Sequence, residues 1–180
     1  MMQKIIVLGS TGSVGKSSLE VIEQNKNYVA KCLVASTNFN LINQQSKIHK
    51  QAKIYLENPK KNSISKPLIN KEKLYDLISS SQTDTVIAAI SGSSGLELIH
   101  HSIKSGKKVL IANKEPLVMA GEFLMNEAKK NNALIIPIDS EHCSVHQSIR
   151  NIDKKDISKV TITCSGGPFY SLQKNKFKEI

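Results

Sequence analysis

Asp139 and Glu141 are two carboxylates that stand one residue apart, directly after the apolar run 134–138. A run of that length is typical of a buried strand, and its carboxyl end is where open α/β sheets bind ligands. Residues two apart share one face of a strand, and in a turn two carboxylates can still converge on one ion. Hard oxygen ligands suit Mg²⁺ or Mn²⁺ better than zinc. The pair therefore predicts a divalent-metal site, with a solvated acidic turn as the alternative.

A glycine-rich loop, residues 9–15 with the sequence Gly-Ser-Thr-Gly-Ser-Val-Gly, is the second candidate site. It follows an apolar run and opens a helical pattern, so its glycines can form a tight turn and bring backbone N–H groups against a phosphate. A dinucleotide-binding fingerprint is G-x-G-x-x-G, and this loop has one residue more before its second glycine. We interpret the loop as a dinucleotide-binding turn.

A nucleoside triphosphatase is the alternative interpretation of the same loop. Gly15-Lys16-Ser17 matches the end of a phosphate-binding P-loop, but Ser10 stands where that loop needs its first glycine. The run 134–139 is similar to the acidic strand of these enzymes. Asn113-Lys114 is similar to a guanine-recognition motif, yet Pro116 occupies the place of its aspartate. Each partial match fails at a position or spacing that the chemistry needs, so dinucleotide binding is favoured.

The end of the second predicted strand bears on which dinucleotide would bind. NAD-binding folds place an acid there, which accepts a hydrogen bond from the ribose 2′-hydroxyl. Here the strand ends in Ala-Ser-Thr-Asn, residues 35–38, with no acid. Hydroxyl and amide groups can donate to a 2′-phosphate that a carboxylate would repel. Ser36, Thr37 and Asn38 therefore favour NADP over NAD.

Short apolar runs alternate along the chain with segments of helical periodicity. The predicted strands are residues 4–8, 29–35, 54–56, 85–90, 108–112, 134–138 and 160–164. The predicted helices are residues 14–24, 41–49, 73–79, 96–105, 116–131 and 140–150, with an exposed loop at 58–71. This alternation predicts an α/β fold, a doubly wound and mostly parallel Rossmann-like sheet.

Composition excludes several classes of protein. The 180 residues carry a net charge of +10, but Arg150 is the only arginine and aromatic residues make up 4%, so the basic clusters of nucleic-acid binders are missing. No apolar run reaches the length of a membrane span. Cys32, Cys143 and Cys164 form no paired pattern, which argues against a disulfide framework. We expect a cytoplasmic protein that binds neither nucleic acid nor membrane.

Four segments in this order closely resemble one family. They are Gly-Ser-Thr-Gly-Ser-Val-Gly at 9–15, Ala-Asn-Lys-Glu at 112–115, Pro-Ile-Asp-Ser-Glu-His at 137–142 and Thr-Cys-Ser-Gly-Gly-Pro-Phe at 163–169. Together they resemble the 1-deoxy-D-xylulose 5-phosphate reductoisomerases. These are NADPH- and metal-dependent enzymes of the methylerythritol phosphate route to isoprenoids. The resemblance runs through essentially the whole chain.

The resemblance implies a role for each matching position. Contacts to the cofactor are implied for Thr11, Gly12, Ser13, Val14, Ser36, Thr37, Asn38, Asn113 and Glu115. The segment 89–92 would lie near the nicotinamide. Contacts to the substrate are implied for Lys114, Ser140, Glu141 and Ser165, the last of these through its phosphate. Asp139 and Glu141 would bind Mg²⁺ or Mn²⁺, and with Lys114 they would carry the catalysis.

The resemblance also implies how the chain is organised. Residues 1–138 would form the NADPH-binding domain, and residues 139–180 would begin an α+β catalytic domain. Family members continue with a third metal carboxylate, much of the phosphate pocket and a mobile lid. We therefore expect a truncated chain that is inactive by itself. The whole enzyme would act as a homodimer on a small phosphorylated sugar, giving 2-C-methyl-D-erythritol 4-phosphate. A non-catalytic module that binds NADP(H) is the second hypothesis.

Overall fold

The computed structural model describes residues 2–59 and 66–162. The chain divides into two compact units, residues 1–139 and 140–180. The division falls one residue beyond the domain boundary expected from the sequence. Each unit is described by itself below.

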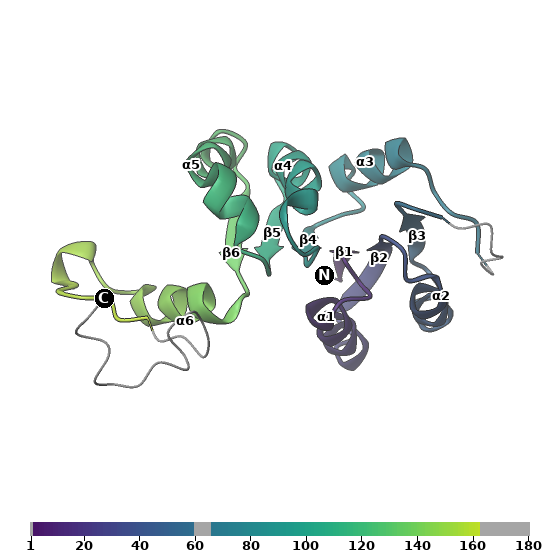
Figure 1. Cartoon of the computed structure of the whole chain (residues 1–180), viewed down its shortest axis with the longest axis horizontal. Helices are drawn as coiled ribbons and strands as arrows, with labels where there is room; N and C mark the ends of the chain where they lie inside the picture. The colour runs from purple at the N-terminus through teal and green to yellow at the C-terminus, as the bar shows by residue number, and fades with distance from the viewer. Residues whose placement is uncertain (1, 60–65, 163–180) are drawn as a thin grey trace, which may run out of the picture. The chain divides into compact units, whose positions relative to one another are not determined.

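A six-stranded sheet forms the centre of the first unit (Figure 1). Its strands are β1 (Gln3–Leu8), β2 (Tyr28–Ala35), β3 (Lys53–Leu56), β4 (Thr85–Ala88), β5 (Lys108–Ile111) and β6 (Leu134–Pro137). They are ordered β3-β2-β1-β4-β5-β6, and every neighbouring pair is parallel. The α/β fold with a doubly wound, Rossmann-like sheet is confirmed.

Helices cover both faces of this sheet (Figure 1). They are α1 (Ser13–Gln24), α2 (Phe39–Ile48), α3 (Lys71–Ser79), α4 (Leu96–Lys104) and α5 (Glu115–Lys130), with a short 3₁₀ turn, η1 (Ser93–Gly95), before α4. Helices α1 and α2 lie on one face, and α3, α4 and α5 lie on the other. Strands and helices therefore alternate along the chain, and the helices connect parallel strands, as the sequence predicted.

The central strands are rich in apolar residues because helices cover both faces of the sheet, whereas the edge strand β6 is only partly buried. In β1, Ile5 and Val7 join the core beneath α1 and α2, whereas Ile6 and Leu8 join the core beneath α3, α4 and α5. Cys32 on β2 belongs to the second core, and burial raises the pKa of its thiol to about 12. Such a thiol is a packing residue and not a nucleophile.

The strand order reverses between β1 and β4, and this reversal creates the crevice in which open α/β sheets bind ligands. The chain winds outward from β1 through β2 to β3 and then returns to place β4 on the other side of β1. The loops after β1 and β4 consequently diverge to opposite faces. Strand β4 ends at Ala88, two residues earlier than predicted, so Ala89 and Ile90 belong to the loop at this crevice.

The second unit contains helix α6 (Ser140–Ile149) and a 3₁₀ turn, η2 (Lys154–Asp156). The strand predicted at 160–164 is wrong over its described part, because residues 157–162 are neither helix nor strand. Val160 and Ile162 are exposed, and the described residues supply no neighbouring strand to bond with this segment. The predicted Ser-Gly-Gly-Pro-Phe turn at 165–169 lies outside the described residues. No helix in the described ranges is long and apolar enough to cross a membrane.

Candidate functional site

The loop between β1 and α1 is held too tightly to admit side chains at two of its glycines. Gly9 has a φ of +82°, and a Cβ there would lie 2.4 Å from the Ala89 carbonyl oxygen. A Cβ on Gly15 would lie 2.2 Å from the Gly9 carbonyl oxygen. Glycine at these positions lets α1 approach the ends of β1 and β4, which brings the helix N-terminus to the crevice.

Backbone hydrogen bonds fix this loop above the neighbouring strand β2. The amides of Gly9 and Ser10 both donate to the Val34 carbonyl at 2.9 Å, and the Gly12 amide donates to the Gly9 carbonyl at 3.0 Å. Gly12 occupies the N-cap position of α1, where no side chain caps the helix. The first amides of α1 are therefore available to an anion, as a phosphate-binding helix N-terminus requires.

A buried pair of side chains supports the loop from behind. The Ser10 hydroxyl donates to Gln45 Oε1 at 2.9 Å, and Gln45 Nε2 donates to the Ser10 carbonyl at 2.8 Å. Both residues are buried, so each hydrogen bond is shielded from water. The pair ties the glycine loop to α2 and keeps its backbone in one conformation.

Replacing Gln45 with leucine is expected to destabilise the fold by about 1–3 kcal/mol, because the buried Ser10 groups lose their partner. The same change should weaken dinucleotide binding, since the loop would no longer be fixed. Urea denaturation followed by circular dichroism measures the first effect, and a fluorescence titration with NADPH measures the second. Gln44→Leu, at the exposed neighbouring position, is the control and should leave both unchanged. Equal behaviour of the two variants would contradict this role for Gln45.

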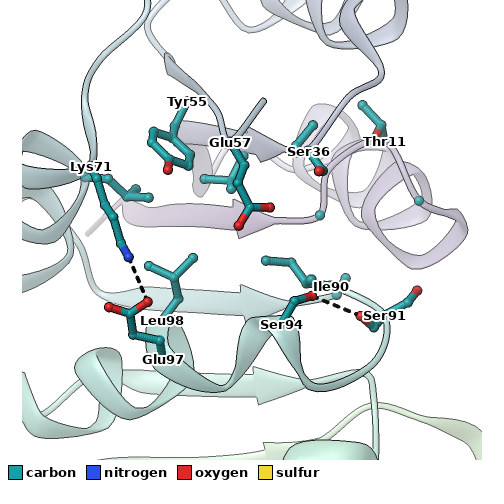
Figure 2. Close-up of a pocket in the computed structure, with 16 residues that line it drawn as sticks. Thr11, Ser36, Tyr55, Glu57, Lys71, Ile90, Ser91, Ser94, Glu97 and Leu98 are labelled. Atoms are coloured by element: carbon teal, nitrogen blue, oxygen red, sulfur yellow. Dashed lines mark hydrogen bonds and ion pairs between the residues drawn. The ribbon is translucent and has the colours of Figure 1, made fainter. Parts of the chain in front are cut away.

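A cavity of about 320 Å³ opens beside the glycine loop at the carboxyl ends of the strands. It is bounded by the loop after β1, the ends of β2 and β3, the start of α3, the loop after β4 and the start of α4 (Figure 2). The lining residues are Gly9, Thr11, Gly12, Val34, Ala35, Ser36, Tyr55, Glu57, Lys71, Leu74, Ala89, Ile90, Ser91, Ser94, Glu97 and Leu98.

Apolar side chains such as Val34, Leu74 and Leu98 line this pocket together with hydroxyl and charged groups. Lys71 Nζ lies 2.8 Å from Glu97 Oε2, across the end of the pocket formed by α3 and α4 (Figure 2). The ion pair raises the pKa of Lys71 and lowers that of Glu97. Tyr75, whose pKa burial raises to about 12, lies beneath the Lys71 ammonium at 5.7 Å from its ring centroid. A pocket with apolar walls and several polar groups can hold a planar ring and fix its orientation.

The three residues expected at the 2′-position of the ribose have different environments. Ser36 lines the pocket, and its carbonyl accepts from the Asn58 amide at 3.1 Å. Thr37 is exposed and lies outside the lining set. Asn38 caps α2, because its side-chain oxygen accepts from the Leu41 amide at 3.2 Å. The structure thus brings Ser36 together with Thr11 and Gly12, while Asn38 also serves the helix.

The Asn-Lys-Glu segment joins β5 to α5. Asn113 Nδ2 donates to the Gly92 carbonyl at 2.9 Å, which fastens the loop after β5 to the loop after β4. Asn113 Oδ1 is buried and has no partner among the described residues, so one acceptor remains for a ligand. Lys114 is the N-cap residue of α5 and Glu115 is its first residue, and both are exposed. Neither lines the pocket described above.

The acidic motif spans the boundary between the two units. Asp139 is the last residue of the first unit and is half-buried. Ser140 and Glu141 begin α6 in the second unit, where the Ser140 hydroxyl donates to Glu141 Oε2 at 2.6 Å. Residues 2–59 and 66–162 contain no group of three or more His, Cys, Asp or Glu side chains that could hold a metal. Ser165 lies outside the described residues.

Two family models together match most of the chain. The model described as 1-deoxy-D-xylulose 5-phosphate reductoisomerase matches residues 5–121, and the model of the C-terminal domain of the same enzyme matches residues 135–180. The chain belongs to the 1-deoxy-D-xylulose 5-phosphate reductoisomerase family. The first match includes the glycine loop, the pocket and the Asn-Lys-Glu segment, and the second includes the whole acidic motif at 137–142.

Curated reductoisomerases from several bacteria are similar to this chain over nearly its whole length. The enzyme of Glaesserella parasuis is 35% identical over 201 aligned positions, which cover 99% of this chain and 51% of the relative. That of Francisella tularensis subsp. novicida is 37% identical, covering 98% and 49%. The chain therefore spans about half the length of the reductoisomerases that it matches.

Solved reductoisomerase structures share the fold. The Zymomonas mobilis enzyme in complex with NADPH has a TM-score of 0.83 and 27% identity, and the match covers all of this chain and 50% of that one. A reductoisomerase in complex with NADPH, fosmidomycin and magnesium has a TM-score of 0.79 and 29% identity, covering 99% and 49%. A biliverdin reductase, 17% identical with a TM-score of 0.56, shares the fold alone.

Several residues of the pocket could not be identified from short motifs. Glu57 follows β3, whereas Lys71 and Glu97 lie in α3 and α4, so these three residues meet only through the tertiary fold. Gln45 could have been recognised from the sequence, because it lies three residues after Ile42 and therefore on the buried face of α2. A polar side chain at an inward helical position requires a buried partner.

Proposed function

We propose that this chain is the cofactor-binding part of a 1-deoxy-D-xylulose 5-phosphate reductoisomerase and that it binds NADPH. The observation that carries the proposal is the pocket beside the uncapped N-terminus of α1, where glycines let the helix approach the ends of β1 and β4. Residues 1–138 would form the NADPH-binding domain, and residues 139–180 would begin the catalytic domain.

The residues present fit the cofactor. Thr11, Gly12, Ser13 and Val14 would hold the pyrophosphate, because they form the last loop residues and first turn of α1. Ser36 and its neighbours Thr37 and Asn38 would face the adenosine ribose. Asn113 Oδ1, buried without a partner among the described residues, would accept a hydrogen bond from the cofactor beside the loop 89–92, and Glu115 would lie close by.

The remaining site residues would act on the phosphorylated sugar in a protein that includes the other half of the family's sequence. Asp139 and Glu141 would bind Mg²⁺ or Mn²⁺, which when bound stabilises negative charge on substrate oxygens. Lys114, exposed at the start of α5, would add positive charge beside the substrate. Ser140 and Ser165 would position the substrate by hydrogen bonds, Ser165 at its phosphate. NADPH would reduce the rearranged product to 2-C-methyl-D-erythritol 4-phosphate. We expect a homodimer.

A fluorescence titration of the 180-residue chain with NADPH tests the cofactor proposal. We expect saturable binding of one dinucleotide, because all pocket residues belong to one compact unit. The same titration with ATP and Mg²⁺ tests the nucleoside triphosphatase alternative, for which we expect no binding. ATP binding without NADPH binding would overturn the proposal.

Activity is tested by extending the chain with the part of the Francisella tularensis subsp. novicida enzyme that lies beyond the match. We expect this protein to oxidise NADPH when 1-deoxy-D-xylulose 5-phosphate and Mn²⁺ are added. The 180 residues alone should show no turnover, because a transition-state site needs all its charged groups in place. A folded extended protein without NADPH oxidation would refute the assignment. Turnover by the 180 residues alone would refute the expectation that they are inactive, and NADPH binding without chemistry in both proteins would favour a non-catalytic module.

A further inference from the structure

A short segment, residues 66–70, lies along the edge strand β3 and leads directly into α3. Leu68 forms a parallel bridge with Ile54 of β3, and the Ile69 amide donates to the Ile54 carbonyl at 2.9 Å. The Ile69 side chain packs against the core beneath α3, α4 and α5. We call this segment the strap, because it ties the edge of the sheet to the helix that follows.

The first residue of the strap, Lys66, fastens it to the turn between α2 and β3. Its ammonium donates to the carbonyl oxygens of Lys50 at 2.6 Å, His49 at 3.3 Å and Ala52 at 3.4 Å. His49 is the C-cap residue of α2. The ammonium therefore lies where a helix leaves carbonyl groups unbonded and where the helix dipole favours a cation. These bonds hold the start of the strap at a fixed place beside the sheet.

The strap ends where the pocket begins. Its last residue, Asn70, caps α3 by accepting from the Lys73 amide at 2.9 Å. The next residue, Lys71, lines the pocket, and so does Tyr55 on β3 (Figure 2). The strap itself does not line the pocket, but it is bonded to both of these elements. The position of the α3 side of the pocket therefore depends on where the strap is held.

A binding site that is already in place when its ligand arrives loses less ordering free energy on binding. We propose that Lys66 is a positioning residue for the cofactor, which fixes the α3 side of the pocket by fastening the strap to the turn between α2 and β3. Lys66 acts through α3, since it does not line the pocket. This inference rests on the proposed dinucleotide function.

The first test compares the NADPH affinity of Lys66→Met with that of the unaltered 180-residue chain by fluorescence titration. Methionine keeps most of the side-chain length but cannot donate to the three carbonyls, so we expect the dissociation constant to rise about fivefold to tenfold. Lys66→Arg keeps a cationic donor and should bind NADPH almost as the unaltered chain does. Lys73→Met is the control for the lost charge, because Lys73 is exposed on α3 and does not line the pocket. Its affinity should stay within about twofold of the unaltered chain.

Hydrogen exchange of the Ile69 amide distinguishes positioning from a general loss of stability. In Lys66→Met we expect this amide to exchange at least about tenfold faster than in the unaltered chain, and NADPH should slow its exchange in both proteins. The amide of Ile87, in the buried central strand β4, should be equally protected in the two proteins. A lysine that served only the stability of the fold would affect both amides together.

The outcomes separate this inference from the proposed function. Equal NADPH affinity in Lys66→Met and Lys73→Met overturns the inference and leaves NADPH binding established, and so does a parallel loss of protection at Ile69 and Ile87. If Lys66→Met does not fold, the Ile69 amide of the unaltered chain decides. Slower exchange with NADPH then supports the inference, and an unchanged rate overturns it. Failure of the folded, unaltered chain to bind NADPH overturns the proposed function and this inference with it.

Discussion

Replacing Gly9 with alanine is expected to destabilise the chain by about 2–4 kcal/mol and to weaken NADPH binding at least about tenfold. Two effects add at this position. The φ of +82° is unfavourable for any residue with a Cβ, and that Cβ would lie 2.4 Å from the Ala89 carbonyl oxygen. The Ala89 carbonyl belongs to backbone that is held beside β1 and cannot yield. The glycine loop would therefore have to move, and it would leave the phosphate-binding position.

Two other glycines separate these effects. Gly92 has a φ of +72°, but a Cβ added there would meet nothing within 4 Å, so Gly92→Ala should show only the conformational cost of about 1–2 kcal/mol. Gly121 has no positive φ and also open space, so Gly121→Ala in α5 should change stability by less than about 1 kcal/mol. Urea denaturation of the three variants measures the free energy of unfolding and ranks their losses of stability. A Gly9→Ala variant as stable as Gly121→Ala would contradict the tight loop.

The sheet and its helices were predictable because the central strands, such as β1 and β4, are buried on both faces. Continuous apolar runs such as 5–8 and 109–112 are the direct consequence of that burial, and the helical periods between them indicate a parallel sheet. The glycine loop was predictable for a similar reason, since the turn into α1 needs residues without side chains. The strand predicted at 160–164 is wrong where it is described, because apolar residues alone do not supply a neighbouring strand.

Glu57, one of the two acids that line the pocket, was not predictable from the end of β2. The segment 35–38 contains no acid, and the sequence therefore favoured NADP. The structure places Glu57 at the same edge through the parallel pairing of β2 with β3, in which Ala35 lies opposite Leu56. Register between strands sets which residues share an edge, and it is a property of the folded sheet. The Ser10–Gln45 pair likewise depends on contact between segments 35 residues apart.

Changing Asp139 to asparagine in the extended enzyme is expected to lower turnover by at least about a hundredfold. An amide oxygen is a neutral and weaker ligand for Mg²⁺ or Mn²⁺ than a carboxylate. The chain contains no described cluster of three acidic or histidine ligands that could replace it. Asp139 belongs to the same compact unit as the pocket but is not among its lining residues, so NADPH should bind with unchanged affinity. Glu141→Gln should give the same pattern.

Asp153→Asn is the matched control for this change. Asp153 is exposed and caps η2 by accepting from the Lys155 amide at 3.2 Å, a bond that the asparagine oxygen can also accept. This control should keep full turnover at every Mn²⁺ concentration, whereas Asp139→Asn should recover part of its activity as Mn²⁺ is raised. Loss of NADPH affinity in Asp139→Asn would instead point to a structural defect at the end of β6. Undiminished turnover in both acidic variants would show that the metal is bound elsewhere, because a cation site cannot lose charged ligands without losing affinity.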